Sequence, residues 1–207
     1  SSLLPAVVNY RVADGQRLNN KTNPNEARAI VALMQACIQQ PEYAGKTYKF
    51  ERQYEKYVKS GDPNDLKVYQ DLINKYPEGV PFSAIDKNGN TTAIFEKYIM
   101  KYKGTDKPIQ FTYDKISKKS LQNGTCLVGD SSASSPDFKK FWQSLKETGK
   151  FSSAEIAELK ATCTIHHAAD MRTLQLVPRD LHQAVSHTGG GSFIRQQFGN
   201  LINSLTR

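Results

Sequence analysis

The sequence predicts an α+β fold, with a mainly helical region at residues 1–95 and a mixed domain at residues 96–207. Apolar residues recur at helical spacing in the first region, whereas alternating β-branched segments appear in the second. The sequence pattern changes from helical to β-leaning after the segment PEGVPFSAIDKNGNTT, so we expect an approximate domain boundary near residue 90. At 207 residues the chain can bury one core, or a core with an appended subdomain.

Three helices are predicted in the first region. One begins at Asn23 with Asn-Pro-Asn and ends at Pro41; the others lie in YKFERQYEKYV and NDLKVYQDLINKYPEGV. The last of these carries one stripe of Leu66, Tyr69, Ile73 and Tyr76. Interleaved Lys and Tyr could stack on unpaired bases. An aromatic stripe at helical spacing is more typical of a core, and we expect a core here.

The second region begins with a β-leaning segment, PIQFTYDKI, and a loop-like one, SLQNGTCLVGDSSASSP. The segment PDFKKFWQSLKETGK is then predicted to be a helix, which Ser135-Pro136-Asp137 starts. A short helix follows in SSAEIAELK, where Ser152 and Glu155 form a capping signal. The longer helix is expected to point these residues inward: Phe138, Phe141, Trp142 and Leu145.

A strand, a turn, a second strand and a helix are predicted between residues 161 and 186. ATCTIHH and TLQLVP alternate as strands do, and AADMR turns the chain between them. Pro178 suits the first turn of the helix RDLHQAVS, which the glycines at 189–191 are expected to terminate.

All four histidines of the chain lie in or just after this unit: His166, His167, His182 and His187. Neighbouring strand residues point to opposite faces, so His166 and His167 cannot share one role. One can bind a metal ion while the other faces a substrate. Hydrolysis of a phosphodiester needs this division, because a divalent ion polarises the phosphoryl oxygen and a neutral imidazole accepts a proton from water.

A family resemblance rests on IHH at 165–167, LQLVP at 174–178, His182 and HTGG at 187–190. This order resembles the HNH and endonuclease VII superfamily with a ββα-metal (His-Me finger) core. Within it, the chain is similar to WHH- or LHH-type nuclease domains of bacterial polymorphic toxins. The resemblance covers residues 160–191. It is weaker in PDFKKFWQSL and does not extend to residues 1–95.

The resemblance implies that His167 is the general base, that His166 and His182 are metal ligands, and that His187 is the third ligand. His182 and His187 are five residues apart, which on an ideal helix separates them by about 140°. The helix must therefore end or distort before His187, or His187 contacts phosphate instead. The superfamily's middle Asn falls on Thr173, so Gln175 or the backbone is expected to support the loop.

A structural zinc site is the main alternative. Cys163 lies three positions before His166 and could close a C-x2-H…H-x4-H shell in a non-catalytic, nucleic-acid-binding module. Strand alternation puts Cys163 and His166 on opposite faces, which disfavours the closed site. Asp170 is expected to be a turn residue, or an acceptor for a ligand imidazole.

The net charge of +8 indicates a polyanionic partner or a solvated basic surface. We predict phosphate contacts by Arg179, Lys118 and Lys119. The last two belong to a lysine patch with only two opposing acids: Lys97, Lys101, Lys103, Lys107, Lys115, Lys118 and Lys119. No apolar run approaches the roughly 18 residues of a membrane span.

Together these features predict a metal-dependent endonuclease that cuts DNA with little sequence preference. A ribonuclease with the same core is the alternative among enzymes. The cofactor is expected to be one divalent ion, with Zn, Ni, Mg and Mn as candidates. The toxin resemblance implies secretion or delivery into a target cell's cytoplasm and an acidic immunity protein as partner. Because the chain opens SSLLPAVV, we expect a processed product or an excised domain.

Overall fold

The computed structural model of the chain describes residues 47–48, 50–81, 92–185 and 187–206. Two units are distinguished: Ser1–Ile94 with Gln183–His187, and Phe95–His182 with Thr188–Arg207. The helix predicted from Asn23 lies outside the described residues. Within the described part, no helix has both the length and the apolar character that crossing a bilayer requires.

The first unit contains a helical hairpin and a short two-stranded sheet. Strand β1 (Thr47–Tyr48) pairs antiparallel with β2 (Val80–Pro81), and helices α3 (Glu51–Ser60) and α4 (Pro63–Lys75) lie between them in sequence. Helix α4 begins at Asp62, whose carboxylate accepts a hydrogen bond from the backbone N–H of Asn64. The predicted stripe is buried, which confirms its core role: Leu66, Tyr69, Ile73 and Tyr76.

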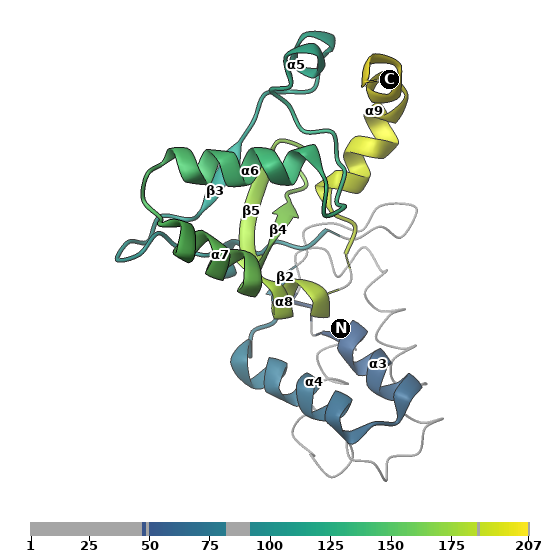
Figure 1. The fold of residues 1–207 in the computed structure, drawn as a ribbon. Coiled ribbons are helices and arrows are strands. Elements are labelled where there is room, and N and C mark those ends of the chain that lie inside the picture. Colours follow the sequence, from purple (N-terminus) through teal and green to yellow (C-terminus); the bar gives the residue numbers. More distant parts are fainter. Residues whose placement is uncertain (1–46, 49, 82–91, 186, 207) are drawn as a thin grey trace. The chain divides into compact units, whose positions relative to one another are not determined.

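A three-stranded antiparallel sheet forms the centre of the second unit, in the order β3-β5-β4 (Figure 1). Its strands are β3 (Gln110–Thr112), β4 (Cys163–His167) and β5 (Thr173–Pro178). The helices of this unit are η2 (Glu96–Tyr98), α5 (Lys118–Asn123), α6 (Pro136–Glu147), α7 (Ser153–Thr162) and α9 (Gly190–Thr206). Helix α8 (Arg179–Ala184) belongs to this unit as far as His182.

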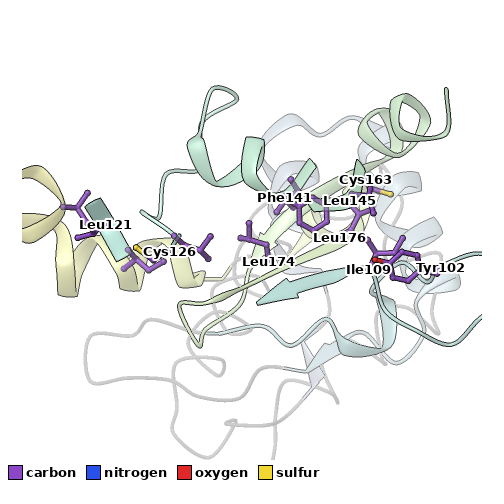
Figure 2. Packing of buried hydrophobic residues seen from close by; sticks show 13 residues of the cluster. Tyr102, Ile109, Leu121, Cys126, Phe141, Leu145, Cys163, Leu174 and Leu176 are labelled. Carbon is purple, nitrogen blue, oxygen red and sulfur yellow. The ribbon is translucent and has the colours of Figure 1, made fainter. Parts of the chain in front are cut away.

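The core of the second unit joins α6 to strand β5. Phe141 and Leu145 of α6 and Leu174 and Leu176 of β5 are all completely buried in one cluster (Figure 2). Leu121, from the segment of α5, belongs to the same cluster nearer to α9. The predicted inward face of α6 is confirmed for its two buried residues, while its other two members, Phe138 and Trp142, pack partly buried against the cluster.

Two predicted segments differ from the structure at their ends. The segment expected to be a loop from Ser120 begins inside helix α5, because Ser117 and Ser120 cap that helix reciprocally. Residues 161–162, expected in a strand, extend α7 instead. Strand β4 therefore starts at Cys163, where the helical hydrogen bonding of α7 ends.

The strand predicted in TLQLVP is confirmed as β5, and the helix predicted in RDLHQAVS starts at Arg179 as expected but ends at Ala184. Pro178 ends β5, opposite Cys163, and α8 starts one residue later. The glycines at 189–191 do not terminate α8, which ends at Ala184; they start α9, for which no helix was predicted. The first helical hydrogen bonds of α9 run from Ser192 N–H and Phe193 N–H to the carbonyl of Gly189.

The turn between β4 and β5 is held by Asp170. Its carboxylate accepts hydrogen bonds from the backbone N–H groups of Arg172 and Thr173, both at 2.9 Å, and from Thr173 Oγ1 at 2.6 Å. Gln175, one of the two supports expected for this loop, instead donates to Gln110 Oε1 on β3. The other expected support, the backbone, is present, because Ala168 N–H donates to the carbonyl of Thr173 and Met171 N–H donates to that of Ala168. A short carboxylate therefore replaces the expected amide, and Asp170 is a turn residue as predicted.

Replacement of Asp170 by Asn is expected to destabilise the second unit at neutral pH. Burial raises the pKa of Asp170, whereas the hydrogen bonds from Thr173 and Arg172 lower it. The hydrogen bonds outweigh burial, so the pKa of Asp170 lies below its ordinary value. A carboxyl with a depressed folded-state pKa contributes stability above its unfolded pKa, about 3.9, and this is lost as the pH falls through the folded pKa. Unfolding in denaturant, followed by fluorescence of the single tryptophan, Trp142, will measure the difference.

The exposed Asp106 provides the control, because Asp106→Asn removes the same charge from the surface of the same unit. We expect Asp170→Asn alone to lose stability at neutral pH, and its curve to approach that of the parent in acid. Equal stability losses in the two variants would show that the turn does not depend on Asp170.

Candidate active site

Three imidazoles lie close together: one from β4, one from α8 and one from the segment that follows α8. Nδ1 of His166, a buried residue of β4, lies 3.3 Å from Nε2 of His182 on α8. Ligand atoms of His166, His182 and His187 all lie within 4.8 Å of one another. Two ligands of a tetrahedral zinc ion, each about 2.0–2.1 Å from the metal, are about 3.3–3.4 Å apart. The spacing and the nitrogen donors therefore fit a divalent cation, which these three residues could hold.

His187 joins this cluster because α8 ends first. The helix stops at Ala184, so the five-residue spacing from His182 does not follow a continuous helix. The carbonyl of Val185 accepts a hydrogen bond from His187 Nδ1 at 2.9 Å, which leaves the lone pair on Nε2. Burial lowers the pKa of His187, opposed by the hydrogen bond to Val185, so the ring favours the neutral form that a metal ligand needs.

Phe95 packs against two of these imidazoles. Its ring centroid lies 4.7 Å from that of His166, edge to face, and 5.5 Å from that of His182. The Phe95 side chain is buried, so both rings have an apolar neighbour. Phe95 is not predictable as a site residue, because a single phenylalanine far from the histidines in the sequence has no pattern that links it to them.

The imidazole of His167 has entirely different partners. Its Nε2 lies 2.9 Å from Oδ2 of Asp137, and these two side chains are 4% and 0% exposed. The ring of Phe138 lies 5.9 Å away. The prediction that His166 and His167 face different surroundings is therefore confirmed. Asp137 is not predictable as a site residue from the sequence, where Ser135-Pro136-Asp137 indicates only the start of a helix.

Cys163 is separate from the imidazole cluster. It is buried, and its Sγ lies 3.5 Å from Thr162 Oγ1. Burial raises the pKa of the Cys163 thiol, which disfavours the thiolate that binds zinc. The group of potential ligands around His166 contains three histidines and not this cysteine. The closed four-ligand shell is therefore not the arrangement that the described residues form.

The predicted phosphate-binding residues lie in two other places. The guanidinium of Arg179 donates to the carbonyls of Lys160, Ala161 and Cys163 and so caps the end of α7. Lys118 and Lys119 occupy the exposed first turn of α5. None of the three belongs to the imidazole cluster. Their contacts with phosphate stay predictions.

Glycines bring the start of α9 against the end of β4. A Cβ on Gly190 would lie 1.8 Å from the carbonyl oxygen of Ala168 and 3.2 Å from that of His167. A Cβ on Gly191 would lie 2.9 Å from the carbonyl oxygen of Gly129, in the segment that donates to Asp137. The HTGG segment therefore allows close backbone approach beside His167.

Clustered imidazoles next to a carboxylate-bound imidazole are the groups that a hydrolase uses. Residues 164–197 match the model of a family described as a nuclease of the HNH/ENDO VII superfamily with conserved WHH. The predicted resemblance is confirmed over this segment, in which the chain reads Ile165-His166-His167. No curated protein and no solved structure gave a match.

Proposed function

We propose that the chain is a metal-dependent endonuclease that hydrolyses DNA with little sequence preference. One observation carries the proposal: three histidines able to hold a cation lie beside a fourth, His167, within the segment that matches a nuclease family. In this proposal β4, β5 and α8 form the ββα-metal core. The order strand, turn, strand, helix supports that assignment.

Each histidine has a separate role in the proposed reaction. His166, His182 and His187 hold the divalent ion through neutral imidazole nitrogens. The bound ion supplies a positive charge that polarises the phosphoryl oxygen and stabilises the leaving oxygen. His167 faces other partners than the ligands do, and accepts the proton of the attacking water as general base.

Exposed lysines support a nucleic acid substrate without base readout. All seven residues of the lysine patch are exposed, and the chain has a net charge of +8. Contacts with phosphate increase affinity for any sequence and weaken as salt displaces them. We propose that Lys118, Lys119 and Arg179 contribute such contacts. Cutting should therefore slow at high salt and show little sequence preference.

We further propose that this nuclease is the toxic domain of an antibacterial effector, which is secreted or delivered and acts in the cytoplasm of the target cell. An acidic immunity protein would then protect the producer, and the basic charge of the nuclease would speed its capture. These roles follow from the family resemblance. Survival of bacteria that express the chain, with and without the neighbouring gene's product, tests them.

Digestion of nucleic acids by metal-stripped protein tests the enzymatic proposal. We expect supercoiled plasmid to be nicked after addition of Zn, Ni, Mg or Mn, and the reaction to stop with a chelator. Cutting of RNA with intact plasmid would assign the ribonuclease alternative. Binding of both nucleic acids without cutting, under every ion, would favour the zinc-stabilised binding module.

Metal titration of two variants separates the proposed ligand set from the closed zinc shell. His182→Ala is expected to weaken metal affinity by roughly 100-fold or more, because it removes one of three direct ligands. Cys163→Ala should leave the affinity unchanged, since its thiol lies outside the cluster. Isothermal titration with Zn measures both. A comparable loss in Cys163→Ala would contradict the three-histidine site.

A further inference from the structure

We infer that Asp137 is a positioning residue for the proposed general base. Its carboxylate holds Nε2 of His167 as a hydrogen-bond donor, so that Nδ1 carries the lone pair that accepts the proton. Asp137 lies outside the segment that matches the nuclease family. The inference rests on the proposed catalytic role of His167, but it makes a statement about the imidazole that can be tested separately.

The carboxylate of Asp137 is itself rigidly held. Val128 N–H donates to Oδ1 at 2.9 Å, and Gly129 N–H donates to Oδ2 at 2.8 Å. Its own backbone N–H donates to Oγ of Ser135, the N-cap of α6. A buried carboxylate is costly unless donors compensate its charge, and here the donors also fix its direction. Oδ2 is thereby aimed at His167.

The chemistry of the pair assigns the tautomer. An ionised carboxylate can only accept hydrogen bonds, so the proton between Asp137 and His167 belongs to Nε2. In a neutral imidazole the other nitrogen, Nδ1, then holds the lone pair. Within the part of the chain that the structure describes, His167 Nδ1 makes no hydrogen bond. The ring is therefore fixed at one nitrogen and available at the other.

A purely structural role for Asp137 has a different signature. An acidic residue in the first turn of a helix stabilises the helix dipole, and Asp137 is such a residue in α6. The helix dipole alone requires neither complete burial nor a contact with an imidazole, and Asp137 has both. If the role were only structural, replacing Asp137 would change stability without changing the His167 tautomer.

Asp137→Asn tests the inference by kinetics and by NMR. The amide has the shape of the carboxylate, but only one of its two terminal atoms is an oxygen that accepts hydrogen bonds. The three donors, which are the N–H groups of Val128, Gly129 and His167, therefore lose one of their two acceptor atoms. We expect kcat to fall by roughly 100-fold or more, while KM for a short duplex and the affinity for Zn stay within about threefold. Long-range ¹H–¹⁵N correlation spectra of metal-free protein, recorded above the ordinary imidazole pKa, should show the Nε2–H tautomer of His167 in the parent and a mixture in the variant.

Ser152→Ala serves as the matched control, because it removes the N-cap of another helix of the same unit, α7, and Ser152 does not contact the carboxylate–imidazole pair. Loss of the cap should lower the melting temperature by about 2–4 °C and leave kcat and the tautomer unchanged. An Nδ1–H tautomer in the parent protein would overturn the inference even if Asp137→Asn does not fold. Unchanged kcat in a folded Asp137→Asn would do the same. Failure of the parent to cut any nucleic acid would overturn the proposed function instead.

Discussion

Replacing His167 by alanine will lower the rate of plasmid cutting by roughly 10²–10⁴-fold, the usual contribution of a general base. Metal binding will persist, because the proposed ligands are the other three histidines. Single-turnover cutting of a defined duplex, together with titration of Zn, measures the two effects. Loss of cutting with retained metal binding is the result that a structural zinc site cannot produce.

His166→Ala is the matched control for this experiment. Both residues lie on β4 and both are buried, yet they contact different partners. His166→Ala should lose metal affinity and cutting together. His167→Ala also leaves the buried Asp137 carboxylate with one donor fewer, so His167→Gln, which restores an N–H donor, separates loss of the base from loss of packing. Parent-like cutting by His167→Gln would exclude His167 as the base.

The locally encoded parts of the fold and site could be predicted from the sequence. Strand alternation sends adjacent side chains to opposite faces, and this alone separated His166 from His167. Helical spacing likewise identified the buried face of α4. The His-His pair, the LQLVP strand and the HTGG segment together predicted the nuclease resemblance that the family match supports.

Contacts between distant segments could not be predicted in this way. Asp137 lies 30 residues from His167 in the sequence, and Ser-Pro-Asp is an ordinary helix start. Asp137 is buried because α6 packs on the sheet, and this packing between distant segments has no local sequence pattern. Phe95 is a similar case, because nothing in its surrounding sequence indicates that it contacts two histidines.

The glycines at 189–191 show how a sound local rule can fail. Glycine commonly follows a helix end, so the sequence predicts that this run terminates α8. The structure instead begins α9 there, and the missing side chain at Gly190 permits contact with the backbone at Ala168. The helix-end preference of glycine reflects the backbone conformations that it can adopt. At Gly190 the lack of a side chain serves another purpose, which is the close approach of α9 to the backbone at Ala168.

Gly190→Ala is accordingly expected to destabilise the second unit by about 3 kcal/mol, near the upper range for overpacking. The added Cβ would meet the carbonyl oxygen of Ala168 at 1.8 Å, and a backbone atom cannot move away as a flexible side chain can. Either α9 or the end of β4 must shift, and His167 is the last residue of that strand. Denaturant unfolding followed by Trp142 fluorescence measures the loss, and plasmid cutting should fall with it.

Gly199→Ala provides the control in the same helix. Apart from its chain neighbours and the nearby backbone of α9 itself, no atom of the described residues lies within 4 Å of a Cβ placed there, and alanine is more stable than glycine in a helix interior by about 0.5–1 kcal/mol. This variant should therefore be slightly more stable than the parent and cut at the same rate. If Gly190→Ala were also as stable and as active as the parent, the close packing of α9 on β4 would not be what holds His167 in place.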